Sequence, residues 1–409
     1  MRVMAAAMMA LALAGSSTWA RAADPPPGPQ EANGYTRYEL LAPGSGRFRI
    51  LYDITAIRPG ATAFFNPIRK GSIASDESVT DRATGAPLKF RVVSGEEAKT
   101  TGLPDADPAS DYIRVELAHP VPADGGEARM LIEKTYEDAR SYFVEGQELV
   151  FDRPLGIKRN AVVLPPGYVL VSCNYPSQVA QEPDGRIRVS FLNITPGQAP
   201  LKLRAAPGRI ASGPSSVEPG RLAERAVQTR DIVYFLQPPE THAFDLYHDY
   251  TETRPGVGRY VNVVRPGSTA TNPSAQNLDT GAPIPARRLK GAAITAAGIT
   301  DPSLKTVEPD SEVVVFDFTP LKPGQSIRLR MRETYTDPGR YRLAGDELVF
   351  DRAFGRPANA VVLPKGWALT NSTVPAVVTR LDDGRIRLDL QNPRNDELQV
   401  VITARRLAG

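Results

Sequence analysis

The sequence contains one long segment twice, and this internal repeat limits the possible folds more than any other feature. Its most similar part reads ELVFDRPLGIKRNAVVLPPG at Glu148–Gly167 and ELVFDRAFGRPANAVVLPKG at Glu347–Gly366. From Tyr142 to Asn193 of the first copy the two align without a gap, and about half of the positions are identical. Two copies of this length predict a duplicated domain, since each copy is longer than the repeats of ordinary solenoids.

Both copies carry the pattern of short strands joined by turns. Arg47–Ile54 (RFRILYDI) alternates apolar and polar residues, as a half-buried strand does. Asp184-Gly185 lies between two alternating segments and predicts a tight hairpin, because both central residues of that turn need a positive φ angle. The strand signals recur at the spacing typical of sandwiches and barrels. We therefore expect an all-β protein of two homologous β-sandwich-like domains that arose by internal duplication.

The limits of the repeats divide the chain into five expected segments. Arg2, a short apolar run and the small-residue site Ala20-Arg21-Ala22 are typical of a cleaved secretory signal. The expected order is a signal peptide at 1–22, a flexible leader at 23–33, a first β-repeat domain at 34–207, a linker with a short helix (Arg221–Arg230) at 208–230, and a second β-repeat domain at 231–409. The signal predicts a periplasmic or extracellular protein.

Composition argues against several classes of protein. Cys173 is the one cysteine, so no intrachain disulfide can form and the small disulfide-stapled scaffolds are excluded. The formal net charge is +3 and the basic residues form no long run, so we expect no nucleic-acid partner. No apolar segment after the signal is long enough to cross a bilayer, so we expect no membrane span after signal cleavage.

An Asp–Arg pair stands at the same place in each repeat and supplies four candidate ligand-binding residues. The pairs are Asp152-Arg153 and Asp351-Arg352. Adjacent residues of a strand point to opposite faces, so the charges of one pair should not bind each other. A structural role, for example Asp152 holding the turn near Gly156, is the favoured interpretation because a half-buried charge needs a partner. Contact with a charged ligand is the alternative.

Two histidines of the second copy are the remaining candidates. His242 and His248 lie six residues apart in an alternating segment, so both could face the same side of a strand. The first copy has Gly46 and Tyr52 at these places. The spacing is not a zinc signature and two ligands do not complete a metal shell, so solvated or packed histidines are the favoured interpretation.

Sequence motifs for catalysis and cofactor binding are missing. The chain lacks H-E-x-x-H, G-x-S-x-G, S-x-x-K and the glycine-rich phosphate-binding and dinucleotide-binding patterns. We therefore assign no catalytic residue, metal ligand or cofactor. Asp105, Asp107 and Asp111 alternate in the way calcium-binding carboxylates can, but they do not follow the EF-hand pattern, so a solvated loop is favoured.

Three short motifs carry a resemblance to other proteins. They are Phe151-Asp152-Arg153, Asn160–Pro165 and Asp184-Gly185-Arg186, each with its copy. With them the two repeats resemble a family of secreted bacterial proteins in which a β-rich unit occurs twice. The resemblance covers both repeats and implies the duplicated fold and export, and it carries no activity to this chain.

Export, duplicated β-domains and missing catalytic motifs together predict an exported, non-catalytic binding or scaffold protein of the bacterial envelope. Its partner would be an envelope or extracellular molecule. One alternative is a hydrolase with a site at the interdomain cleft that uses His242 or His248 with Glu240. Another is a carbohydrate- or peptide-binding module. The Asp–Arg pairs, which both copies keep, favour a scaffold, since an enzyme usually keeps one site and loses the second.

Overall fold

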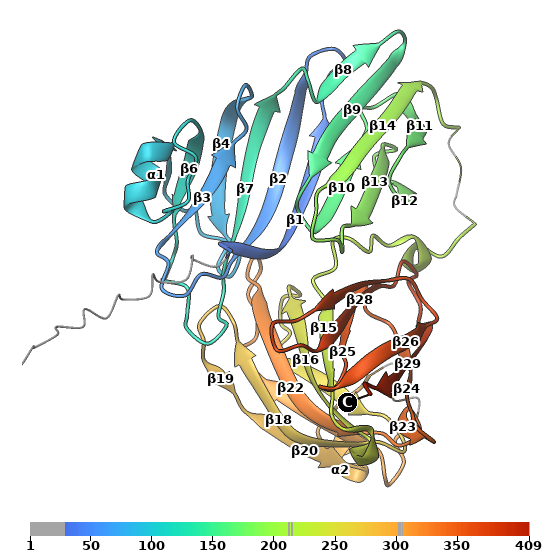
Figure 1. The fold of residues 1–409 in the computed structure, drawn as a ribbon. Coiled ribbons are helices and arrows are strands. Elements are labelled where there is room, and N and C mark those ends of the chain that lie inside the picture. The colour runs from blue at the N-terminus through green and yellow to red at the C-terminus, as the bar shows by residue number, and fades with distance from the viewer. Residues whose placement is uncertain (1–28, 212, 214–215, 302–303, 305, 409) are drawn as a thin grey trace, which may run out of the picture.

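The structure is a computed structural model that describes residues 29–211, 213, 216–301, 304 and 306–408. Regular structure in these ranges is almost entirely β-strand, arranged in two halves that follow each other along the chain (Figure 1). The predicted all-β fold of two homologous domains is confirmed. The expected signal peptide and the first residues of the expected leader lie outside the described residues.

The first half contains three sheets. Their strand orders are β12-β13-β10-β1-β2-β7-β4, β11-β14-β9-β8 and β3-β6-β5. The strands are β1 (Glu31–Leu40), β2 (Arg47–Ala56), β3 (Ala63–Ile68), β4 (Ile73–Asp81), β5 (Phe90–Ser94), β6 (Asp111–Glu116), β7 (Ala128–Glu137), β8 (Tyr142–Glu145), β9 (Glu148–Leu155), β10 (Arg159–Val163), β11 (Tyr168–Cys173), β12 (Gln178–Gln181), β13 (Ile187–Leu192) and β14 (Ala199–Pro207). One short helix, α1 (Gly95–Thr101), is capped by the Ser94 side chain.

The second half repeats this arrangement. Its strand orders are β19-β18-β22-β16-β15-β25-β28-β27, β23-β24-β29-β26 and β17-β21-β20. The strands are β15 (Asp231–Leu236), β16 (Ala243–Glu252), β17 (Arg259–Val264), β18 (Thr269–Asn277), β19 (Pro283–Ile284), β20 (Ala286–Lys290), β21 (Glu312–Asp317), β22 (Ile327–Thr336), β23 (Tyr341–Ala344), β24 (Glu347–Phe354), β25 (Ala358–Val362), β26 (Trp367–Ser372), β27 (Ala376–Arg380), β28 (Ile386–Gln391) and β29 (Leu398–Arg406). The helical turns are η1 (Pro219–Leu222), η2 (Pro239–Thr241) and α2 (Ala292–Ala296).

The strands of the two halves correspond one to one, apart from β19. At the place of β19 the first half has an isolated bridge between Thr80 and Pro87. Each half has one parallel pair in its largest sheet, β1 with β10 and β15 with β25. The cores match as well: the Phe48 and Phe151 rings meet edge-on at 5.5 Å, and the Phe244 and Phe350 rings do so at 5.6 Å.

The most similar part of the repeat connects two sheets of its half. Glu148–Leu155 forms β9 in the four-stranded sheet, and Arg159–Val163 forms β10 in the seven-stranded sheet. All five residues of β10 are buried. The segment therefore contributes to both walls of one core, where even a small change of side-chain volume is felt. This position gives a physical reason for its similarity in the two copies.

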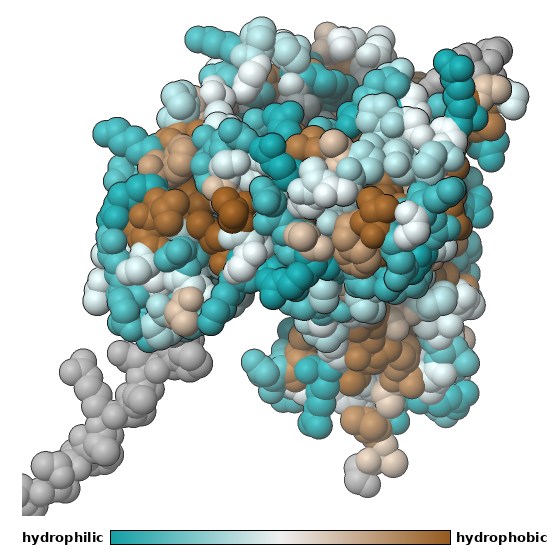
Figure 2. Space-filling view, turned by 90° about the horizontal axis from the view of Figure 1, so that it is seen from above, coloured by the Kyte–Doolittle hydropathy of each residue, from teal (hydrophilic) through white to brown (hydrophobic). Residues whose placement is uncertain are grey.

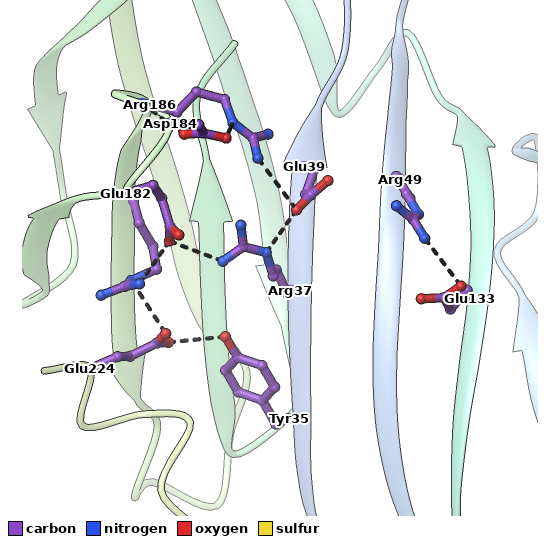
Figure 3. Close-up of polar contacts among 10 residues, drawn as sticks. Tyr35, Arg37, Glu39, Arg49, Glu133, Glu182, Asp184, Arg186 and Glu224 are labelled. Carbon is purple, nitrogen blue, oxygen red and sulfur yellow. Dashed lines mark hydrogen bonds and ion pairs between the residues drawn. The ribbon is translucent and has the colours of Figure 1, made fainter. Parts of the chain in front are cut away.

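The described residues between the halves, 216–230 among them, form no α-helix, so the helix predicted at Arg221–Arg230 is wrong. Beyond a short helical turn its backbone is irregular. The Tyr35 hydroxyl donates to Glu224 at 3.0 Å in the first half (Figure 3), and Arg225 donates to the Gly355 carbonyl at 3.1 Å in the second. Consecutive side chains thus bind opposite halves, and this requirement overrides the helical propensity of the segment.

The leader is also shorter than predicted. Strand β1 begins at Glu31, within the segment expected to be flexible up to residue 33. The Ile57 amide donates to the Gln30 carbonyl at 2.9 Å, just before the strand. The start of β1 is held by its pairing with β2, Glu31 with Ala56 and Ala32 with Thr55, and β10 pairs with the other edge from Tyr35 on.

Ion pairs join the two halves directly. Arg129 of β7 donates two hydrogen bonds to Asp279, at 2.6 and 2.8 Å, and both side chains are buried. A nitrogen of Arg328 in β22 lies 3.6 Å from a carboxylate oxygen of Glu127. The boundary is therefore charged and paired, in contrast to the apolar core of each half.

The outer surface is mixed in character. On the face drawn in Figure 2, apolar side chains form separate groups divided by hydrophilic residues. No helix in the described part of the chain has both the length and the apolar character needed to cross a membrane.

Candidate functional site

The second half contains a polar cavity of about 590 Å³. Its walls come from β15, β16 and β22 of the eight-stranded sheet, from β17, and from the turn between β24 and β25. We call it the second-half cavity. The polar residues on which its chemistry depends are Arg230, His248, Tyr260, Glu333, Arg352 and Arg356. The volume is within the range of ordinary small-molecule sites.

His248 lies in β16, where alternate residues face the cavity, and it joins two other polar residues. Its Nε2 accepts a hydrogen bond from Arg356 Nε at 3.1 Å, and its Nδ1 lies 3.1 Å from the Tyr260 hydroxyl. Since a guanidinium can only donate, the neutral ring carries its proton on Nδ1 and donates it to Tyr260. Burial lowers the pKa of His248 well below its usual value, and the nearby Arg356 lowers it further. The Tyr260 hydroxyl keeps its own proton for donation to a ligand.

Glu333 of β22 is a second unusual group of the cavity. One carboxyl oxygen accepts a hydrogen bond from Asn262 at 2.5 Å, and the other is buried without a hydrogen-bond partner among the described residues. Burial raises the pKa of Glu333 to about 7, although Arg288 and Asn262 act in the opposite direction. The side chain is therefore partly protonated near neutral pH.

Two arginines of the cavity lack a carboxylate partner among the residues that the structure describes. Arg356 donates to the neutral His248. Arg230 lies over the Tyr250 ring, 4.6 Å from its centroid. A third guanidinium, that of Arg352, lies 3.5 Å from Asp337, but its buried Nε has no hydrogen-bond partner within the described part of the chain.

The first half has two apolar residues, a tyrosine and a lysine at the equivalent positions. In the first copy, Tyr52 is equivalent to His248, Phe64 to Tyr260, Ile157 to Arg356 and Lys134 to Glu333. Phe64 is buried in the first core and Ile157 packs against it. A Cβ atom added at Gly34, the counterpart of Arg230, would lie 3.3 Å from both Ile157 and Tyr52. The combination of Arg230, His248, Tyr260 and Arg356 is thus a property of the second copy.

The seven-stranded sheet of the first half carries arginines that, unlike Arg230 and Arg356, are paired with carboxylates. Arg37 donates to Glu39 at 2.8 Å and to Glu182 at 3.0 Å (Figure 3). Arg49 lies 3.1 Å from Glu133 in the same view. Partnered guanidinium groups of this kind stabilise a surface and offer little to a ligand.

Within each Asp–Arg pair, the two side chains point to opposite faces of the strand, as expected. Asp152 lies 3.0 Å from Lys202 on the neighbouring strand and does not hold the turn near Gly156. Arg153 is buried and donates to Asp138 at 3.1 Å. In the second half, Asp351 accepts a hydrogen bond from Gln399, while Arg352 lines the cavity.

The two histidine candidates lie in different surroundings. His242 has a left-handed backbone at the end of a helical turn, and its Nδ1 is 3.0 Å from the Tyr341 carbonyl. Glu240 pairs with Arg406 at 2.5 Å, so it is not the partner of His248. Of the sequence candidates, the structure brings His248 and Arg352 together in one cavity. The acidic-loop residue Asp107 caps the Ala109 amide at 2.9 Å, and no group of three or more possible metal-ligating side chains occurs among the described residues.

Sequence reasoning missed Arg230, Tyr260, Glu333 and Arg356. Each was visible as a difference between the copies: Arg356 replaces an isoleucine, and Tyr260 a phenylalanine. These substitutions come from four separate segments, so only the fold shows that they meet.

Comparison with known proteins finds no matching family model and no matching curated protein. Among solved structures, an M1 zinc metallopeptidase from Deinococcus radiodurans has 13% identity and a TM-score of 0.29, over 42% of this chain and 41% of that one. An aminopeptidase N family protein from Idiomarina loihiensis has 10% identity and a TM-score of 0.27, over 42% of this chain and 29% of that one. A protein from Legionella pneumophila described as nutrient-binding has 10% identity and a TM-score of 0.27, over 43% and 66%. Likeness at this level carries no functional argument.

Proposed function

We propose that this protein is an exported, non-catalytic binding protein of the bacterial envelope that holds a small organic anion in the second-half cavity. The observation that carries the proposal is the pair Arg230 and Arg356, which line the cavity without a carboxylate partner among the described residues. Export rests on the signal pattern at Met1–Ala22.

The charge of the cavity favours an anion. Its cationic residues are Arg230, Arg265, Arg340, Arg352 and Arg356, which outnumber its carboxylates, Asp301, Glu333 and Glu397. Glu397 lies 3.3 Å from Arg265. Asp337 is shared by Arg340 and Arg352, at 3.2 and 3.5 Å. Glu333 is partly neutral because its pKa is raised to about 7. A half-buried cation is stabilised by a paired anion, and a ligand acid group would supply that partner.

Hydrogen-bonding groups could orient such a ligand. The Tyr260 hydroxyl and the Arg352 Nε are donors with capacity to spare, and Asn359 Oδ1 is a buried acceptor without a hydrogen-bond partner in the described chain. A bound molecule with an acid group and a neighbouring hydroxyl or amide group would satisfy all three. Unmade hydrogen bonds of buried groups cost about 1–3 kcal/mol each, so their satisfaction supports affinity.

A hydrolase is the second candidate, and Glu333 is the observation in its favour. A buried carboxyl group with a pKa of about 7 has the property of a general acid or base at neutral pH. If the protein is a hydrolase, a panel of esters, peptides and glycosides will give product, and Glu333→Gln will abolish turnover while ligand binding remains. Absence of turnover across the panel favours the binding protein.

Isothermal titration of the full mature chain with small carboxylates, phosphates and sulfonates tests the binding proposal. We expect at least one anion to bind with one site per chain. Arg356→Gln should weaken its binding by about 10–100-fold, since a charge-assisted hydrogen bond contributes about 1.5–3 kcal/mol.

Arg287→Gln is the matched control, because it removes the same charge from an exposed residue of the second half that pairs with Asp317. It should bind like the wild type. The proposal is wrong if no anion binds below about 1 mM, a dissociation constant that corresponds to about −4 kcal/mol, or if Arg356→Gln binds as tightly as the wild type.

A further inference from the structure

The second-half cavity shares walls with two neighbouring cavities. A middle cavity of about 590 Å³ is also lined by Arg230 and Tyr260. A third cavity of about 570 Å³ lies at the boundary between the halves and shares Arg230, Tyr250 and Arg254 with the middle one. We call the third one the boundary cavity. Arg230 lines all three, so they follow one another along the molecule.

The length of this series of cavities can be measured along strand β16. His248 lines the second-half cavity, and Glu252, four residues further along the same strand, lines both the middle and the boundary cavities. Four residues of a strand span about 13 Å at roughly 3.3 Å per residue. A molecule that extends from one end to the other must therefore be several times longer than a single acid group.

The boundary cavity, at the far end of the series, is also lined by arginines. The boundary cavity is lined by Arg82 of the first half and by Arg254 of the second. Arg254 lies 2.7 Å from Glu252, but 70% of its side chain is exposed. Arg82 lies 3.0 Å from Asp53 and is 39% exposed. Both guanidinium groups are accessible, and they come from different halves of the chain.

Aromatic rings line the centre of the series. The rings of Tyr250 and Tyr260 have centroids 5.2 Å apart, and the Arg230 guanidinium lies over Tyr250. Flat aromatic faces and a guanidinium plane suit the uncharged body of a ligand, while the arginines at either end suit its acid groups.

We propose that the bound anion is a linear molecule with acid groups separated by at least about 13 Å, lying from the second-half cavity past Arg230 to the boundary cavity. This inference rests on the proposed function and adds the length and charge distribution of the ligand. Such a molecule touches both halves and holds them in one relative position. An aliphatic dicarboxylate and an acidic oligosaccharide share this chemistry.

Titration calorimetry on the full mature chain tests the inference. One series contains α,ω-dicarboxylates of increasing length with the matching monocarboxylates, and a second contains galacturonate and its oligomers. We expect affinity to rise at least about tenfold, or about 1.4 kcal/mol, once the acid groups reach the far end. The series that shows the rise identifies the source of the acid groups.

Two variants test the two ends of the proposed binding site separately. Arg356→Gln should weaken short and long ligands alike, whereas Arg254→Gln should weaken only the long ones, by at least about tenfold. Arg58→Gln, the equivalent position of the first repeat, is the control and should change neither. If short anions bind as tightly as long ones, or Arg254→Gln leaves long ligands unaffected, the inference is overturned and the proposed function stands. If no anion of any length binds, both fall.

Discussion

Glu333 and Lys134 occupy equivalent positions of the two repeats and predict opposite effects of pH on stability. Both side chains are 4% exposed. Burial raises the pKa of Glu333 to about 7 from its usual 4.5. Burial, together with Arg153, lowers the pKa of Lys134 to about 7 from its usual 10.5. Each group is therefore driven toward its neutral form by the folded chain.

The signs follow from proton linkage. Between pH 4.5 and 7 the folded state binds more protons at Glu333 than the unfolded state, so stability falls as pH rises. Between pH 7 and 10.5 the unfolded state binds more protons at Lys134, so stability rises with pH. At about 1.4 kcal/mol per pH unit, the fall in stability up to pH 7 (the falling limb) amounts to about 3 kcal/mol, and the rise above pH 7 (the rising limb) amounts to about 5 kcal/mol. The two groups together give a minimum of stability near pH 7.

Urea unfolding between pH 4.5 and 10.5 measures both limbs. Trp367 is buried in the second half, so its fluorescence reports on the half that contains Glu333. Far-UV circular dichroism follows the whole chain. Glu333→Gln should remove the falling limb and Lys134→Met the rising limb, each relative to the wild type at the same pH.

The difference between wild type and variant isolates each group from the other carboxylates and histidines that titrate in this range. If Glu333→Gln changes the free energy of unfolding by the same amount at pH 5 and pH 8, the desolvation argument is refuted. Equal effects of Lys134→Met at pH 7 and pH 10 would refute it for the first half.

Two further predictions concern the packing of the chain. Asp279→Asn breaks the buried bidentate pair with Arg129 and should cost about 3–5 kcal/mol in urea unfolding, because a buried cation is left without its partner; a change below about 1 kcal/mol would contradict it. Gly95→Ala should lower the melting temperature, because its Cβ would lie 1.9 Å from the Asp107 carbonyl oxygen and overpacking costs about 1–3 kcal/mol. Gly197→Ala, with no atom within 4 Å of its added Cβ, is the control and should melt like the wild type.

The repeat and the strand periodicity were sufficient to predict the fold class. Segments with regular alternation, such as Arg47–Ile54, became strands as expected. The first strand was missed because Asn33-Gly34 interrupts its alternation, and its register indeed shifts between Ala32 and Tyr35. The linker was misread because its conformation depends on contacts with both halves, and local propensity contains no information on such contacts.

The candidate site was predictable only in part. His248 attracted notice because it is an unusual residue present in one copy, and Arg352 because it repeats. Their proximity depends on the fold, since one lies in β16 and the other in β24. Arg356 is the clearest difference between the copies at this site: it is a charged residue where the other copy has Ile157 in contact with its core.

Replacing the polar residues of the second-half cavity by those of the first half tests the central claim most directly. The variant Arg230→Gly, His248→Tyr, Tyr260→Phe, Arg356→Ile uses only side chains that the same fold already accommodates together in the first copy. Calorimetric titration with the tightest-binding anion should show one site in the wild type and at least a hundredfold weaker binding in the variant, with Trp367 fluorescence and circular dichroism unchanged. A folded variant that binds the anion as tightly as the wild type would contradict the account.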